Sequence, residues 1–180
     1  MARIELINFS LKYYGHRKET LSNINLSFNT NEKILLLSPS GYGKSSLLLC
    51  LLGIIQRNDL GETKGKITID DRDIEEMSHL EVAKIFGIVF QDPENQFCTM
   101  YPEDEIAFSL ENFCIPTEEM GIKIEKVLKQ VKIEDKKREM LLNLSGGEQQ
   151  KVSIGSSLVV GSKMLLLDEP TANLDTLGKV

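Results

Sequence analysis

Strands and helices alternate along this sequence, which predicts an α/β fold with a mainly parallel sheet. Residues 4–13 and 21–28 alternate apolar and polar side chains, a pattern typical of antiparallel strands. Short apolar runs, including 34–37 and 164–167, are typical of buried parallel strands. We therefore expect a parallel core sheet with an N-terminal antiparallel β subdomain.

The chain is long enough to form one domain, 1–180, with a sizeable core. Helical periodicity over 103–137 predicts a helical subdomain at about 103–145. The other expected elements are two helices that each follow glycine-bearing segments, and two further short strands. They lie at 44–56, 146–159, 66–70 and 88–90.

The composition excludes several classes of function. The 180 residues carry a net charge of −6, so the chain has no basic footprint for a nucleic acid partner. No apolar run approaches the roughly 18–20 residues that span a bilayer, and the N-terminus lacks a signal peptide's apolar core. We therefore expect a cytosolic chain, with any membrane contact made through a partner. Its three scattered cysteines are expected to be reduced and structural.

The segment Ser38-Pro39-Ser40-Gly41-Tyr42-Gly43-Lys44-Ser45-Ser46 joins an expected strand to a helix. A strand, a glycine loop and a helix N-terminus in this order form a phosphate-binding loop, or Walker A motif. Its glycines let backbone N–H groups turn toward phosphate oxygens, and the helix N-terminus adds unpaired donors. We expect Lys44 to reach the β- and γ-phosphates of ATP, and Ser45 to coordinate Mg²⁺. The other expected phosphate ligands are Ser38, Ser40, Gly41, Gly43 and Ser46.

Ser38 departs from the motif, which has glycine at this position. If the position required a positive φ, serine would cost about 1–2 kcal/mol and lower the affinity for ATP without abolishing it. The alternative interpretation of the whole segment is an ordinary strand, turn and helix with an exposed lysine.

Leu144-Ser145-Gly146-Gly147-Glu148-Gln149 resembles LSGGQ, the signature motif of ABC-type ATPases, with a glutamate before the glutamine. We expect Ser145 to cap the helix, and Gly146 and Gly147 to allow a close backbone approach. The helix N-terminus would then offer N–H donors and a hydroxyl to a γ-phosphate. A capped helix without a ligand is the alternative. The resemblance implies a P-loop NTPase fold of the ABC type.

Two carboxylates follow the apolar strand Met164-Leu165-Leu166-Leu167, as in a Walker B motif. Asp168 would hold Mg²⁺ through a water, and Glu169 would polarise the attacking water as general base. The alternative is an Asp-Glu-Pro sequence that only ends a surface strand. By the same resemblance, Ala172-Asn173-Leu174-Asp175 is similar to the D-loop, so that Asp175 would help to join two subunits.

Two weaker matches complete the resemblance. Gln91 matches the Q-loop glutamine, which would reach Mg²⁺ and sense the γ-phosphate. Tyr13 matches the A-loop aromatic residue that stacks on adenine, with Tyr14 as the second choice and a packing tyrosine as the alternative.

The resemblance extends from the A-loop to the D-loop, and it implies an ATPase that converts ATP and water to ADP and phosphate. It also implies a homodimer or heterodimer with a second ABC ATPase subunit, each site combining one subunit's Walker A with the other's signature. The family's switch histidine and last strands are absent, since His16 and His79 both lie upstream. The chain is therefore interpreted as a truncated form.

Asp92-Pro93-Glu94-Asn95-Gln96-Phe97 resembles the Q-helix motif of energy-coupling factor importers of vitamins and of cobalt or nickel. Residues 103–108 are also similar to that group. The resemblance implies that a transmembrane coupling subunit binds at Asp92–Phe97, although an ordinary solvated loop is the alternative. It also implies a peripheral protein on the cytoplasmic side of the cell membrane.

Two other functions remain open. One is a soluble ABC ATPase acting on DNA or ribosomes, although no heptads separate the Walker A and signature motifs. The other is a subunit that binds ATP without efficient hydrolysis.

Overall fold

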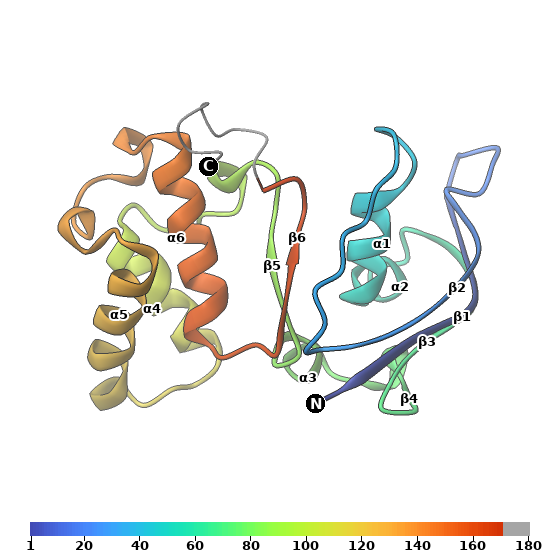
Figure 1. Ribbon diagram of the computed structural model, residues 1–180, viewed down its shortest axis with the longest axis horizontal. Helices are drawn as coiled ribbons and strands as arrows, with labels where there is room; N and C mark the ends of the chain where they lie inside the picture. The colour runs from blue at the N-terminus through green and yellow to red at the C-terminus, as the bar shows by residue number, and fades with distance from the viewer. Residues whose placement is uncertain (171–180) are drawn as a thin grey trace. The chain divides into compact units, whose positions relative to one another are not determined.

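The computed structural model describes residues 1–170 and divides the chain into two compact units. The first unit is Met1–Phe86 and the second begins at Gly87. Figure 1 shows their elements. Each unit is described by itself below.

An antiparallel sheet forms the first unit, with strand order β2-β1-β3-β4. The strands are β1 (Arg3–Tyr13), β2 (Leu21–Asn29), β3 (Gly61–Ile69) and β4 (Arg72–Asp73). Ile4 on the central strand pairs with Phe28 on one side and Ile69 on the other, and all three side chains are buried. The expected antiparallel β subdomain is confirmed.

The predicted buried strand at 34–37 is wrong. No strand is assigned there, and Ile34, Leu35, Leu36 and Leu37 are 45%, 80%, 44% and 80% exposed. An apolar run becomes a buried strand only where other strands supply hydrogen bonds on its edges, and the run itself does not show whether they do. The second sheet has only β5 (Phe86–Val89) and β6 (Met164–Leu167), so a mainly parallel sheet is not confirmed.

Two short helices replace the single one expected after the glycine loop. They are α1 (Lys44–Leu51) and α2 (Ile54–Arg57), separated at Gly53, whose φ is 67°. The guanidinium group of Arg57 bonds to the chain at this break, where it donates to the Leu52 carbonyl at 3.1 Å. The unit ends with the short helices η1 (Ile74–Glu76) and α3 (His79–Ala83).

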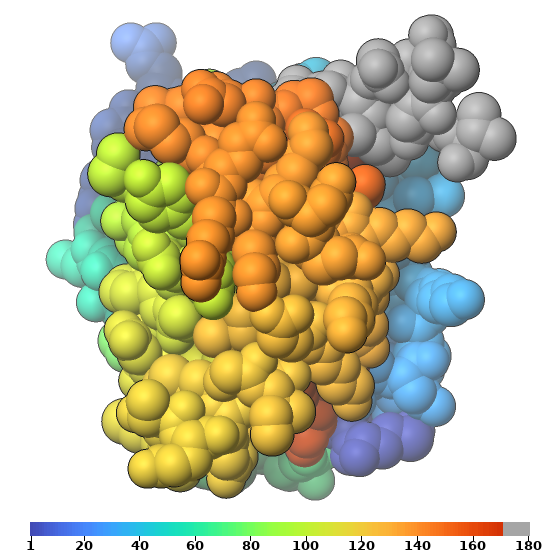
Figure 2. All heavy atoms as spheres, turned by 90° about the vertical axis from the view of Figure 1, so that its left-hand side faces the viewer, coloured from blue at the N-terminus to red at the C-terminus, as the bar shows by residue number. Residues whose placement is uncertain are grey.

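Helices dominate the second unit. They are η2 (Pro93–Asn95), α4 (Pro102–Asn112), α5 (Thr117–Val131), η3 (Glu134–Lys136), η4 (Leu141–Asn143) and α6 (Gly146–Val159). Helix α6 packs against both α4 and α5 around a buried apolar cluster. Figure 2 shows the outer face of these helices. The cluster contains Ile106, Leu110, Ile124, Val127, Leu128, Ile133, Leu141, Leu144 and Val152.

One buried carboxylate fixes the start of α4. Glu105 is 5% exposed, and its Oε2 accepts hydrogen bonds from the backbone N–H of Cys98 and Thr99, at 3.0 and 2.9 Å. The Thr99 hydroxyl donates to the same oxygen at 2.9 Å. Because three donors bond to this oxygen, the burial of the carboxylate is tolerated.

We expect Glu105→Ala to lower the free energy of unfolding by about 2 kcal/mol, because it leaves two backbone donors without their acceptor. The neighbouring exposed carboxylate provides a control: Asp104→Ala should change stability by less than about 1 kcal/mol. Urea unfolding followed by circular dichroism measures both. Equal losses in the two variants would show that the Glu105 hydrogen bonds contribute nothing particular.

Candidate nucleotide-binding site

The glycine loop leads directly into α1. Gly41 and Gly43 have φ values of 81° and 84°, in the left-handed region that glycine enters without strain. A Cβ on Gly43 would also lie 3.0 Å from Leu21 Cδ2 and 3.1 Å from the Thr20 carbonyl oxygen. The loop conformation therefore requires glycine at position 43 for two independent reasons.

Lys44 is the first residue of α1, and its side chain folds over the loop. Its Nζ donates to the carbonyl oxygens of Ser38 and Pro39, at 3.0 and 3.3 Å. The ammonium group therefore lies beside the loop. Ser38 itself does not adopt a positive φ, so the strain considered for serine at this position does not arise.

The N-terminus of α1 suits an anion. Gly43 is its N-cap, no side chain caps the helix, and its first turn contains no acidic residue. The first N–H groups of a helix lack intrahelical acceptors and carry partial positive charge. A phosphate can accept these bonds, so the residues of this loop fit a nucleotide's phosphates.

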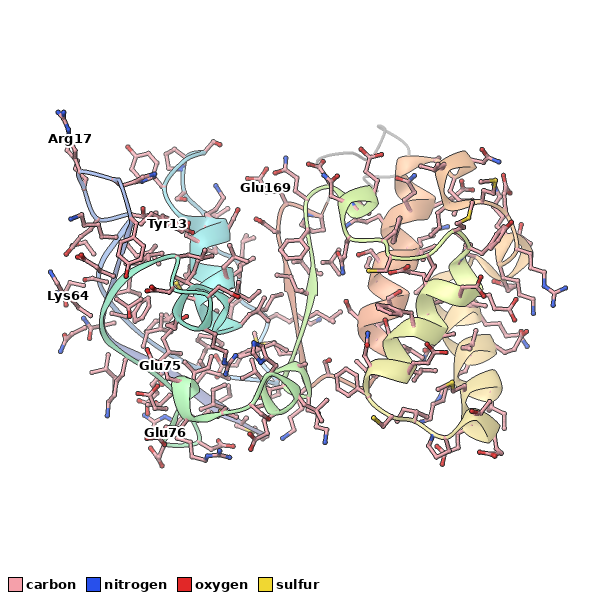
Figure 3. The ribbon with its side chains drawn as sticks, turned by 180° about the vertical axis from the view of Figure 1, so that it is seen from behind. Tyr13, Arg17, Lys64, Glu75, Glu76 and Glu169 are labelled. Atoms are coloured by element: carbon pink, nitrogen blue, oxygen red, sulfur yellow. The ribbon has the colours of Figure 1, made fainter. Side chains whose placement is uncertain are left out.

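The two candidate tyrosines face different partners. The hydroxyl of Tyr13, which is labelled in Figure 3, donates to Ser46 Oγ at 3.1 Å and so links the end of β1 to α1. The Tyr13 ring lies 5.6 Å from the His16 ring. Tyr14 is exposed, and its hydroxyl donates to Asp59 at 2.7 Å, which raises the pKa of Tyr14. Tyr13 thus has the direct link to the loop's helix.

In the second unit, the signature segment begins α6 with Ser145 as its N-cap. Glu148, at the third helical position, reaches back and accepts hydrogen bonds from the Ser145 N–H and hydroxyl, each at 2.8 Å. Lys136 lies 2.7 Å from the other carboxylate oxygen of Glu148. The Lys136 ammonium and then the two Ser145 donors lower the pKa of Glu148 to about 2.

Asp168 and Glu169 follow β6 and differ in environment. Asp168 is 8% exposed, and its N–H donates to the Val89 carbonyl at 2.9 Å, at the end of β5. Glu169 is exposed, with a φ of 47° (Figure 3). Gln91, two residues after β5, is also exposed. Asp175 and the rest of the D-loop match lie outside the described residues.

The candidate residues thus form two groups, one in each unit. The first contains Tyr13, the glycine loop and the start of α1, and the second contains Gln91, Ser145, Asp168 and Glu169. Within residues 1–170, no three His, Cys, Asp or Glu side chains lie close enough to hold a metal ion. The expected Mg²⁺ ligands Ser45, Gln91 and Asp168 include only one such side chain.

Comparison with known proteins identifies the family. A family model described as ABC transporter matches residues 21–172. The chain belongs to this family. It therefore carries an ABC transporter ATP-binding domain with the P-loop NTPase fold.

Several relatives support this assignment. A putative ABC transporter ATP-binding protein of Pyrococcus abyssi is 42% identical over 98% of this chain and 63% of its own length. A putative HMP/thiamine import ATP-binding protein of Bacillus subtilis is 40% identical over 96% of this chain and 31% of its own. The chain thus spans about three fifths of the Pyrococcus ABC protein.

Solved structures of ABC proteins have the same fold. The cbiO1 protein of Clostridium perfringens, described as part of the ABC transporter complex cbiONQ, superposes with a TM-score of 0.82 at 30% identity, over 97% of this chain and 68% of its own. A bacterial Atm1-family ABC exporter with ATP bound gives a TM-score of 0.78 at 24% identity, over 98% of this chain and 31% of its own, and shows the fold alone.

The sequence did not predict the contacts of three side chains in the second unit. Lys136 pairs with Glu148, Gln96 bonds to Ser153, and Glu105 bonds to Cys98 and Thr99. The role of Glu148 left a signal in the sequence, because a glutamate three residues after a serine is typical of a capped helix start.

The pKa of Glu148 predicts a pH-dependent contribution to stability. Because folding lowers this pKa from 4.5 to about 2, the contribution is complete above about pH 4.5 and is lost as the pH falls toward 2. Glu148→Gln keeps a capping side chain and removes the charge. We expect it to destabilise the chain by less than about 1 kcal/mol at neutral pH, because both side chains of the ion pair remain partly exposed to solvent.

Urea unfolding of the wild type and Glu148→Gln across this pH range measures the difference, which should shrink in acid. Lys136→Met is the companion variant. It removes the ammonium group beside Glu148 and should therefore raise the pKa of Glu148, which NMR titration measures. A difference in stability that is independent of pH would argue against a charged Glu148 in the folded state.

Proposed function

We propose that this chain is the nucleotide-binding part of an ABC transporter, and that it binds Mg-ATP and hydrolyses it to power transport. The observation that carries this proposal is the glycine loop before α1. Gly41 and Gly43 are left-handed, Lys44 lies over the loop, and the helix start has no side-chain cap or acidic residue in its first turn. These features suit the phosphates of a nucleotide.

The roles of the other residues follow from the family. In the proposal, Tyr13 stacks on adenine, Lys44 binds the β- and γ-phosphates, and Ser45, Gln91 and Asp168 hold Mg²⁺. Glu169 accepts a proton from the water that attacks the γ-phosphate, and ADP is the leaving group. Ser145, Gly146 and Gly147 bind the γ-phosphate of the ATP that a second ATPase subunit holds, and Asp175 helps to join the two subunits.

Support for an energy-coupling factor importer comes from two relatives. One is named an HMP/thiamine import ATP-binding protein, and the other is described as part of the complex cbiONQ. We propose that this chain likewise works at the cytoplasmic face of a membrane, through a transmembrane coupling subunit. Among residues 1–170, no helix is long and apolar enough to cross a bilayer.

The proposed docking segment is Asp92–Phe97, but only some of its residues are exposed to solvent. Asp92, Glu94 and Asn95 are exposed. Phe97 is partly buried and packs against the helical cluster, which leaves only part of its ring accessible to a partner. Gln96 also turns inward. We therefore assign the docking surface to the exposed polar residues of the segment.

The two alternative functions predict different measurements. A subunit that only binds ATP would bind it without releasing phosphate. A soluble ABC ATPase would purify with ribosomes or nucleic acid and not with membranes. The net charge of −6 disfavours the nucleic acid partner.

We expect Lys44→Ala to lower the affinity for Mg-ATP at least about tenfold, because it removes a charge-assisted contact to the phosphates. Isothermal titration calorimetry measures the dissociation constant. Lys33→Ala, which removes an exposed lysine before the loop, serves as the control and should bind as the wild type does. An unchanged affinity in Lys44→Ala would place the nucleotide elsewhere.

We expect Glu94→Arg to reduce the amount of membrane protein that co-purifies with the tagged chain from detergent-solubilised membranes of its own cells. The variant reverses a charge on the docking segment, so ATP affinity should stay unchanged. Glu75→Arg is the matched control, because it reverses an exposed charge in the first unit (Figure 3). Equal recovery with both variants would remove the docking assignment.

A further inference from the structure

A single amide side chain ties β5 to α6. The Oε1 atom of Gln96 accepts hydrogen bonds from the Phe90 N–H at 3.3 Å and from the Ser153 hydroxyl at 2.9 Å. Its Nε2 donates to the Ile88 carbonyl at 3.2 Å. The amide therefore bonds on both sides of residue 89, at the end of β5, and to the middle of α6.

Two further contacts bring β5 close to α6 at Ser157. The Ser157 hydroxyl donates to the Ile88 carbonyl at 2.8 Å. A Cβ on Gly87 would lie 3.1 Å from Ser157 Cβ of α6 and 2.9 Å from Leu165 Cδ2 of β6, so the backbone of β5 at Gly87 lies close to both elements. Ser153 and Ser157 are only 1% and 7% exposed. These hydroxyls thus bond where no water competes.

The residues that follow Gln96 are also held in place by contacts with neighbouring elements. Glu105 holds the N–H groups of Cys98 and Thr99, and Phe97 packs against the cluster that contains α4 and α6 residues. The residues after Gln96 are therefore bonded to α4, while Gln96 itself is bonded to β5 and α6.

Two candidate γ-phosphate contacts belong to the segments that this link joins. Gln91 directly follows Phe90, whose N–H bonds to Gln96. Ser145 begins the helix that contains Ser153, and eight residues of helix correspond to about 12 Å along one rigid element. The Gln96 amide thus joins the backbone that precedes Gln91 to the helix that begins at Ser145.

We propose that Gln96 is a positioning residue that makes the Q-loop and the signature helix respond together when nucleotide binds. This inference rests on the proposed function. Coupling between sites needs a continuous set of bonded, packed groups, which Phe90, Gln96 and Ser153 provide.

The residue type matters because the link needs a donor and two acceptor positions on one planar group. A glutamate here would place an oxygen against the Ile88 carbonyl, and a leucine would leave Phe90 N–H and the Ser153 hydroxyl without their acceptor. Glutamine satisfies all three partners.

Hydrogen–deuterium exchange of the purified chain, with and without Mg-ATP, tests the proposal. In the wild type, ATP should slow exchange in 41–51 and also in 88–96 and 146–153. In Gln96→Leu, the protection of 41–51 should persist, while the ATP-dependent slowing in 146–153 should fall at least fivefold. Ser153→Ala should change 146–153 in the same direction, and combining it with Gln96→Leu should add little.

Ser156→Ala is the matched control. Ser156 is a buried serine of the same helix, and its hydroxyl has no hydrogen-bond partner within the described chain. This variant should respond to ATP as the wild type does. Ser153→Ala also provides a milder test if Gln96→Leu folds poorly.

The possible results separate the inference from the proposed function. No protection of 41–51 in the wild type would overturn the nucleotide site and the inference with it. Protection of 41–51 without any in 146–153 would overturn the coupling alone. So would a Gln96→Leu variant that responds as the wild type does, or one whose exchange in α6 rises equally with and without ATP, since that is the behaviour of a purely structural link.

Discussion

The unsatisfied N–H groups at the start of a helix are the constraint on which both candidate sites depend. Helix α1 leaves its first donors without a side-chain cap, and no acidic residue occupies its first turn. Helix α6 instead carries Glu148 in its first turn, bonded to Ser145 and paired with Lys136. A phosphate at α1 would meet uncompensated donors, whereas one at α6 would meet a carboxylate whose charge Lys136 balances. The two helix starts therefore differ in what they offer to the same kind of ligand.

The sequence predicted correctly those helices and strands whose ends are determined by residues within the element itself. The bounds of α6 and β6 agree with their prediction, because a capping serine and a short apolar run each define one end of an element. The run at 34–37 failed because burial depends on neighbours that the run does not contain. The single helix expected at 44–56 is broken at Gly53, where a left-handed φ ends the first helix.

The sequence predicted the motifs of the candidate site, but not the side-chain contacts that hold these motifs in place. Glycine spacing and paired carboxylates follow from chemistry that is local in sequence, so the loop before Lys44 and the pair after β6 could be found without a structure. Gln96 was assigned to a docking surface because its segment resembles the Q-helix motif, yet its amide bonds to Ser153, 57 residues away. Polar side chains are exposed on average, but a partly buried amide whose hydrogen-bond partners are all present is also stable, and only the fold supplies these partners.

Backbone strain gives an independent reason to single out Glu169. Among the described residues, eight non-glycine residues have a positive φ, and five of these are Asn or Asp, which tolerate it. Lys132 is the left-handed C-cap of α5, and Cys114 follows the end of α4, where such a conformation commonly satisfies the last carbonyls. Neither explanation applies to Glu169, which is not Asn or Asp and does not end a helix. It follows a strand and precedes Pro170, which further restricts its backbone. Strain of this kind persists only where the surroundings impose it, and it is concentrated at functional sites. The conformation thus supports the catalytic role proposed for Glu169 without reference to any motif.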